Sequence, residues 1–229
     1  MREALAISQE NSFDVAGRTG GGWSASDLER ASVVVVNDRP IPGGDQALAL
    51  ESFVQEGGGL LVVTGERIRW PSDLAPLLPG DVGEPVERGG GREGRLGHLD
   101  FDHPVFEIFR GPRTGDFTGA RFFRTRSLRV AESDSTRILA RYDDGAVALA
   151  ERRLGKGRVL VWSSTLDAFW NDLARQPVFL PFVHQVVRYL SGRTETVSSF
   201  TAGQVLDVTD AGAMATAGLG EVTRALAGE

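Results

Sequence analysis

The chain contains no cysteine among its 229 residues. This absence excludes disulfide bonds and any thiolate nucleophile. Lysine is almost absent as well, because Lys156 is the single lysine and every other basic side chain apart from histidine is an arginine. The formal net charge of -6 is opposite in sign to the basic balance that is usual in nucleic-acid-binding proteins. The composition therefore excludes thiol chemistry and argues against a nucleic-acid partner.

Long hydrophobic runs are also missing. The longest apolar stretch, Pro177 to Val187, is interrupted by His184 and Gln185. It is far shorter than the roughly 20 residues that a membrane-spanning helix needs. The first residues, Met1 to Leu5, do not form the apolar core of a signal peptide. Any attachment to a membrane is therefore expected to use segments outside this chain.

Two short aliphatic runs indicate buried strands. Val33–Val36 is a continuous β-branched run, and Leu60–Val63 is uniformly apolar. Such strands are typical of a parallel sheet that helices cover on both faces. Between them, residues 45–56 carry apolar side chains at helical spacing and are followed by Gly57, which suits a helix C-terminus. This strand–helix–strand order predicts two adjacent parallel strands joined by a right-handed crossover.

Further elements follow from periodicity and turn residues. The turns Asp143-Asp144-Gly145 and Gly155-Lys156-Gly157 predict a series of three hairpin-linked strands. Residues 70–97 are rich in proline and glycine and are expected to be irregular. The other expected elements are a helix at residues 2–9, strands at 13–16, 121–130, 137–142, 146–151 and 158–163, and a helix at 177–190.

The expected fold class is α/β. We predict a three-layer flavodoxin- or amidotransferase-like sheet with helices on both faces, a β-hairpin series and a short C-terminal β appendage. Residues 1–195 form the expected α/β domain, and residues 196–229 begin a small β module or a frayed tail.

A resemblance rests on two groups of motifs. The run Val33–Asp38 and the segment Phe53–Val63 resemble the class I glutamine amidotransferase-like superfamily, as does the Asp102–Val105 segment. Several later motifs resemble one bacterial branch in which this domain lies in a large protein with an aerotolerance-type membrane anchor. These motifs are residues 155–160, 164–167, 170–172 and 177–181.

The resemblance implies an amidotransferase-like fold without the family's chemistry. Family members release ammonia from glutamine with a cysteine–histidine–glutamate triad. Here Thr64-Gly65-Glu66 follows the Leu60–Val63 strand at the turn where a nucleophile is expected, and the chain has no cysteine. Glutaminase activity is therefore excluded, since a thiolate is needed there. The flavodoxin-like order also implies that the first, central strand is missing, which predicts an unpaired edge at Val33–Val36.

A ligand site is expected at the carboxyl ends of the parallel strands, where open α/β sheets bind their ligands. Six residues follow predicted strands and could line one acidic pocket with an aromatic wall: Asp38, Glu66, Asp167, Trp170, Asn171 and Asp172. The alternative is that these polar groups cap loops and helices. No cofactor and no metal ion are expected.

Two other clusters leave alternatives open. The Asp100–His103 segment could supply metal ligands, but a turn whose side chains cap the backbone is the simpler interpretation. The arginine- and phenylalanine-rich segment 110–129 is compatible with a nucleic-acid surface, a charged edge strand or a contact face for another domain. The acidic balance of the chain disfavours the first of these.

Two functions remain open on the sequence alone. The first is a non-catalytic interaction or sensory domain of a bacterial envelope protein on the periplasmic face of the inner membrane. Its expected partners are other domains of the same membrane protein or other envelope proteins. The second is a small-molecule or carbohydrate-active enzyme of the trehalose-utilisation-like type that uses the acidic pocket.

Overall fold

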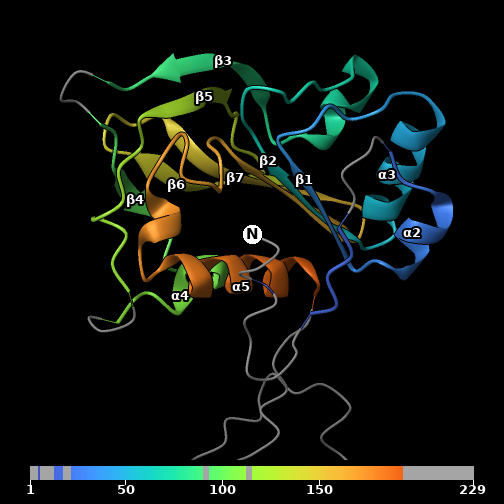
Figure 1. The fold of residues 1–229 in the computed structure, drawn as a ribbon. Coiled ribbons are helices and arrows are strands. Elements are labelled where there is room, and N and C mark those ends of the chain that lie inside the picture. The colour runs from blue at the N-terminus through green and yellow to red at the C-terminus, as the bar shows by residue number, and fades with distance from the viewer. Residues whose placement is uncertain (1–4, 6–12, 18–21, 90–92, 112–114, 193–229) are drawn as a thin grey trace, which may run out of the picture. The chain divides into compact units, whose positions relative to one another are not determined.

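The computed structural model describes residue 5 and residues 13–17, 22–89, 93–111 and 115–192 (Figure 1). Among them, six strands form a main sheet in the order β1-β2-β8-β7-β6-β4, and β3 pairs with β5 in a separate two-stranded ribbon. The main strands are β1 (Val33–Asn37), β2 (Gly59–Val63), β4 (Leu96–Leu99), β6 (Thr136–Tyr142), β7 (Val147–Leu154) and β8 (Gly157–Trp162), and the ribbon strands are β3 (Asp81–Glu87) and β5 (Arg124–Arg129). The helices are α2 (Ala25–Arg30), α3 (Asp45–Gln55), α4 (Pro104–Glu107) and α5 (Phe179–Leu190), with 3-10 turns η1 (Ser72–Leu77) and η2 (Leu173–Arg175).

The main sheet is mixed. Strands β1, β2 and β8 run parallel, with Val33 opposite Gly59 and Gly59 opposite Arg158. The β8–β7, β7–β6 and β6–β4 pairs are antiparallel. The predicted parallel and adjacent placement of the two aliphatic runs is confirmed, and so is the series of hairpin-linked strands.

Two hydrophobic cores cover the two faces of the sheet. Alternate residues of β2 and β8 point to opposite faces, as strand geometry requires. Leu61 and Leu160 pack into the core that α5 covers, whereas Leu60 and Val161 pack into the core that α3 covers. Uniformly apolar strands are thereby buried on both sides, which confirms the predicted α/β class with helices on both faces.

Some predicted elements were wrong. Residues 13–16 form no strand, although Phe13 and Val15 pack against the α5-side core. The proline- and glycine-rich region 70–97 contains η1, β3 and β4 rather than irregular chain alone. Proline and glycine were misleading there because Pro76 lies within a 3-10 turn and Pro85 lies at an irregularity of the β3–β5 ribbon, where a missing N–H is tolerated.

Other predictions lie wholly or mostly outside the described residues. In the predicted first helix only Leu5 is described; it is helical and buried in the α5-side core. The C-terminal module at residues 196–229 lies outside the described part of the chain. A division of the chain by internal contacts falls between Thr194 and Glu195. Within the described ranges, no helix is both long and apolar enough to cross a bilayer.

Candidate functional site

The carboxyl ends of β1, β2 and β8 meet at one edge of the sheet, because these three strands are parallel. Asp38 follows β1, Thr64 to Glu66 follow β2, and Ser163 to Thr165 follow β8. Thr64 and Ser163 are fully buried. This is the place at which an open α/β sheet binds a ligand.

Asp38 holds the loop that follows β2. Its backbone has a φ of 46°, a left-handed conformation that Asp tolerates better than most residues. Its carboxylate accepts hydrogen bonds from the N–H groups of Arg67 and Ile68 at 2.8 and 3.0 Å. A Cβ on Gly65 would lie 2.4 Å from the Asp38 carboxyl carbon, so any side chain at residue 65 would have to displace that carboxylate. Asp38 therefore organises the loop, which is the capping role that the sequence left open.

The side chain of Arg126, which belongs to β5, lies at the carboxyl end of β2. Its side chain is largely buried, at 8% exposure. The guanidinium donates from Nε to the carbonyl of Gly65 at 2.9 Å, from Nη1 to Gly83 at 3.0 Å and from Nη2 to Glu66 at 3.3 Å. Its backbone N–H donates to the carbonyl of Ser163 at 2.6 Å. One arginine thus joins the β3–β5 ribbon to the loops after β2 and β8.

Arg124 lies two residues earlier on the same strand and joins two predicted site residues. Its Nη1 is 2.5 Å from the carboxylate of Glu66, and its Nε is 2.7 Å from Glu87. The guanidinium carbon lies 4.8 Å from the centre of the Trp170 ring, within the range of a cation–π interaction. Glu66 and Trp170 are therefore brought together, with Arg124 between them.

Asn171 is fully buried and fixes the loop after β8. Its amide Nδ2 donates to the carbonyl of Thr165 at 2.7 Å and to Ser164 Oγ at 3.1 Å. Its Oδ1 accepts from the N–H of Leu173 at 3.0 Å. Ser164 in turn donates to the carbonyl of Arg124. The Asn171 side chain, which the sequence predicted to contact a ligand, therefore makes hydrogen bonds with groups of its own chain.

Asp172 and Asp167 also bind groups of their own chain. Asp172 accepts from the backbone N–H and the Nε of Arg121 at 2.6 and 2.8 Å. Burial raises the pKa of the Asp172 carboxyl, but the hydrogen bonds from Arg121 outweigh burial and leave that pKa below its ordinary value. Asp167 is exposed, and its Oδ1 accepts from the N–H of Phe169 at 3.0 Å in a local turn.

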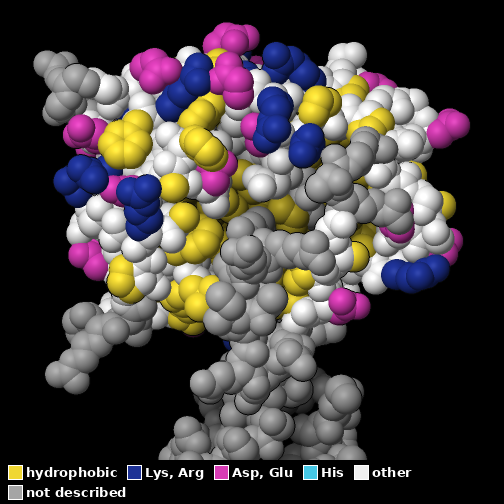
Figure 2. All heavy atoms as spheres, viewed as in Figure 1, with side chains coloured by type: hydrophobic (Ala, Val, Ile, Leu, Met, Phe, Trp, Pro, Cys, Tyr) yellow, Lys and Arg dark blue, Asp and Glu magenta, His cyan; other side chains and the backbone are white. Residues whose placement is uncertain are grey.

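The six predicted residues therefore gather only in part. Glu66 and Trp170 meet through Arg124, and Asp38 lies against Gly65 beside them. The Asn171 side chain instead binds Ser164 and Thr165 in the loop after β8, and Asp172 binds Arg121. The shared ligand-binding role of the six residues stays a prediction. Figure 2 shows basic and acidic side chains interspersed over the upper part of the view, where β3 and β5 lie.

A second polar cluster lies inside the molecule on the α5 side. His103 and Glu151 are 1% and 2% exposed, and His103 Nε2 lies 3.4 Å from a Glu151 carboxylate oxygen. His103 Nδ1 accepts the N–H of Val105 and so caps α4, from which we assign the proton of the neutral ring to Nε2. The hydroxyl of Tyr189 donates to Glu151. The capping interpretation of the Asp100–His103 segment is thus confirmed for His103.

These contacts shift two pKa values in opposite directions. Burial raises the pKa of Glu151, but the donors His103 and Tyr189 outweigh burial and hold that pKa below its ordinary value. Burial, followed by the hydrogen bond to Glu151 and its charge, raises the pKa of Tyr189 to about 12. In the described part of the chain, no group of three or more histidine, aspartate and glutamate side chains is placed to hold a metal ion.

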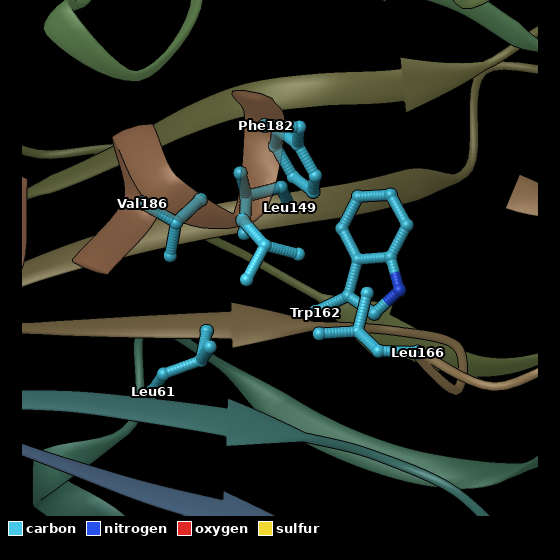
Figure 3. A pocket seen from close by; sticks show the side chains of 7 residues that line it. Leu61, Leu149, Trp162, Leu166, Phe182 and Val186 are labelled. Atoms are coloured by element: carbon cyan, nitrogen blue, oxygen red, sulfur yellow. The ribbon is translucent and has the colours of Figure 1, made fainter. Parts of the chain in front are cut away.

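Two cavities lie elsewhere than around the six predicted residues. One, of about 10 Å³, lies between β2, β7, β8 and α5 and is walled by Leu61, Leu149, Trp162 and Phe182 among others (Figure 3). It has room for about one water molecule, and its apolar walls offer that water no partner. The other, of about 240 Å³, lies beside the turn at residues 132–137 and reaches Glu151 and Arg153. None of the six predicted residues lines either cavity.

Sequence reasoning missed the role of the arginines. Arg124 and Arg126 were recognised only as part of a basic segment, yet they carry most contacts between the ribbon and the strand ends. Arg88 was missed as well; it donates to Thr125 and lies over the ring of buried Tyr142. The available signal was the spacing of two between Arg124 and Arg126, which puts both side chains on one face of a strand.

Comparisons with known proteins identify the fold. No protein-family model and no curated protein matches the chain. A cytoplasmic protein from Salmonella typhimurium is similar at a TM-score of 0.59 and 16% identity, over 75% of this chain and 76% of that one. The mmIFT52 N-terminal domain is similar at a TM-score of 0.54 and 14% identity, over 76% of this chain and 82% of that one. A β-galactosidase from Bacillus circulans is similar at 0.51 and 16%, over 71% of this chain but only 23% of the enzyme. At such identities the likeness shows the fold alone.

Proposed function

We propose that this chain is a non-catalytic, amidotransferase-like interaction or sensory domain of a bacterial envelope protein. The observation that supports this proposal is the position of Arg126, whose guanidinium donates to Gly65, Glu66 and Gly83 at the strand ends. A catalytic crevice needs that space for substrate. Here the chain's own ribbon occupies it, and Thr64 at the turn is buried with its hydroxyl bonded to the carbonyl of Trp162.

The competing carbohydrate-active enzyme requires carboxylates that face a substrate. Glycoside hydrolysis uses two such groups, one of them as an acid or base that exchanges protons with the sugar. Glu66 is in an ion pair with Arg124, and Asp38 accepts from the loop that it supports. The likeness to a β-galactosidase concerns the fold alone. We therefore favour the non-catalytic function, in which the strand-end loops form a rigid surface.

The first experiment is an activity measurement. Purified protein incubated with glutamine is expected to release no ammonia above the buffer control, and a panel of nitrophenyl glycosides is expected to stay intact. Thr64→Val and Glu66→Gln variants serve as matched controls for contaminating enzymes. Turnover by the unchanged protein that is lost in either variant would overturn the proposal.

The location on the periplasmic face of the inner membrane is part of the same proposal. It rests on the resemblance of residues 155–181 to domains of anchored envelope proteins. Alkaline phosphatase and green fluorescent protein fused after Gly192 in the full-length gene report the side of the membrane. We expect phosphatase activity without fluorescence. A fluorescent fusion without phosphatase activity contradicts the location, and the activity measurement above is independent of that result.

A further inference from the structure

The cavity beside the turn at residues 132–137 is polar. Its volume of about 240 Å³ is slightly below the about 300–1,000 Å³ that is typical of sites for drug-sized ligands. The residues that line it are all polar or charged, and they include two arginines and three acidic residues. A cavity of this size and lining suits a small charged molecule.

The register of the sheet places both arginines of the cavity on one face. Arg137 of β6 lies directly opposite Glu151 of β7, and Arg153 follows Glu151 by two residues. Opposite residues share a face, and so do residues two apart on a strand. The shared face is the one that α5 covers, since Tyr189 of α5 donates to Glu151. Arg137 and Arg153 are therefore diagonal neighbours about 7–8 Å apart, a separation that two long side chains can span to reach one anion.

Each of the two arginines is held by a carboxylate of its own chain. Arg137 Nε lies 2.6 Å from Asp100, and Arg153 Nε lies 3.8 Å from Glu151. The closest contact is made through Nε in both cases, and the Nη atoms of the two arginines make no hydrogen bond with any described residue. A guanidinium presents its N–H groups as a planar fork that fits a carboxylate or a phosphate. The two arginines are thus positioned by their carboxylates, and their Nη groups remain for another anion.

The turn adds negative charge to the same cavity. Glu132 and Asp134 line it, and Glu132 Oε1 accepts the N–H of Ile138. Asp134 is exposed, and its carboxylate makes no hydrogen bond within the described ranges. With three carboxylates against two guanidiniums the lining has a net charge of -1, which disfavours a dianion such as phosphate. A metal ion is disfavoured too, because no three acidic or histidine side chains of the described residues are placed to hold one.

We propose that this cavity binds a small zwitterion of the amino-acid type, with its carboxylate between the Nη groups of Arg137 and Arg153 and its ammonium group beside Asp134. Such a ligand gives an anion to the two guanidiniums and a cation to the exposed carboxylate, so each end is bound by charge-assisted hydrogen bonds. Arg153 pairs with Arg158 near the start of β8, whereas the strand ends described above lie beyond the other end of that strand. The inference therefore goes beyond the proposed function and does not depend on it.

Isothermal titration calorimetry with the common L-amino acids tests whether both ends of the ligand are recognised. The amino acid that binds most tightly is compared with the analogue that lacks its amino group and the analogue that lacks its carboxyl group, which for L-alanine are propionate and ethylamine. Each analogue should bind at least about tenfold more weakly, since it leaves charged groups of the cavity without a partner. Absence of binding for every amino acid up to about 10 mM overturns the proposal, and so does tighter binding of inorganic phosphate.

Two variants separate the two ends of the site. Arg153→Gln removes one guanidinium and should weaken the amino acid and its analogue without the amino group alike, at least about tenfold. Asp134→Asn removes the partner of the ammonium group, so it should weaken the amino acid and leave that analogue unchanged. Arg129→Gln is the matched control, because Arg129 is an exposed arginine of the β3–β5 ribbon and does not line the cavity.

Circular dichroism and thermal unfolding check that the variants fold. Asp134 is exposed in a turn, so its variant decides the matter even if Arg153→Gln fails to fold. Unchanged amino-acid binding in Asp134→Asn overturns the proposal, because the ammonium group then has a different partner. A loss in Arg129→Gln as large as in Arg153→Gln overturns it too, because the binding then reflects the general charge of the protein.

Discussion

At the scale of single residues, buried arginines determine the character of the strand ends. Arg126 is the clearest case, because three carbonyl oxygens, two from the loop after β2 and one from β3, depend on one guanidinium. Such a side chain is costly to bury and costly to remove, since its removal leaves several acceptors without a donor. The sequence hides that role, because the acceptors of Arg126 are backbone atoms that no motif identifies.

Replacing Arg126 by alanine is expected to lower the free energy of unfolding by about 2–4 kcal/mol, since the Gly65, Glu66 and Gly83 carbonyls lose their donor. Urea denaturation measures the difference. The matched control is Arg129→Ala on the same strand, where the side chain is 74% exposed and 3.7 Å from Asp81. That change should cost less than about 0.5 kcal/mol. Equal costs for the two variants would mean that the strand-end contacts contribute little.

The pH dependence of stability provides a second residue-scale prediction, at Glu151. Its pKa in the folded protein is below the ordinary value because the donors His103 and Tyr189 outweigh burial. A depressed carboxyl pKa contributes stability above the unfolded pKa of about 4.3, and that contribution is lost as pH falls through the folded value. Stability should therefore decline on acidification below about pH 4–5, and less steeply in Glu151→Gln than in the unchanged protein.

Denaturation midpoints measured from pH 7 to pH 3 give the two slopes. Asp172 and Asp144 also have lowered pKa values, so part of the decline must persist in Glu151→Gln. An identical slope in both proteins would show that Glu151 has no depressed pKa. Lys156 serves as an exposed reference position, where Lys156→Gln is expected to leave the slope unchanged.

At the scale of elements, the sequence predicted those helices and strands that the spacing of apolar residues encodes. The α3 and α5 helices, the β1–β2 pair and the β6–β7–β8 hairpins all follow from apolar spacing and turn glycines. The β3 strand did not, because Gly83 and Pro85 interrupt its pattern and only its partner β5 makes it a strand. Strand formation there depends on a contact 40 or so residues away, which local propensity does not contain.

The α5 helix shows how one apolar stripe fastens an element to the sheet. Phe182 is 2% exposed and lies near the rings of Phe106, Phe117 and Trp162. Phe182→Ala is expected to lower the free energy of unfolding by about 3–5 kcal/mol and to enlarge the cavity in Figure 3. Leu48→Ala on α3, where Leu48 is 61% exposed, should change it by less than about 0.5 kcal/mol. Thermal and urea unfolding of both variants provides the measurement.

At the scale of the whole molecule, the fold and the site were predictable to different degrees. The helix-covered α/β sheet follows from uniformly apolar strands, which require cover on both faces. The site prediction points to the carboxyl ends of β1, β2 and β8, and it assumed that these strand ends were open. Whether residues such as Glu66 and Asn171 face a ligand or their own chain depends on where the β3–β5 ribbon folds back. That long-range arrangement leaves no local pattern in the sequence.

The contacts between the β3–β5 ribbon and the strand ends lead to a final prediction, which concerns hydrogen exchange. The N–H of Thr64 donates to Trp162 at the ends of β2 and β8, and the N–H of Arg126, in the ribbon itself, donates to Ser163. Exchange at these amides should require the ribbon to lift, and it should be slow in the unchanged protein. Arg126→Ala removes the side-chain contacts that hold the ribbon down, so both amides should exchange at least about tenfold faster, which corresponds to about 1.4 kcal/mol of opening energy.

The control amides lie in the β6–β7 hairpin, where Tyr142 donates to Ala146 and no contact with Arg126 intervenes. Their exchange should change little, provided that it is measured under conditions where local opening precedes global unfolding. Equal acceleration of Thr64 and Tyr142 would mean that the variant simply unfolds more often. Rapid exchange of Thr64 in the unchanged protein would mean that the strand ends open spontaneously, and a ligand could then enter where the ribbon now lies. The same measurement therefore distinguishes a surface that is permanently closed from a crevice that the ribbon only covers.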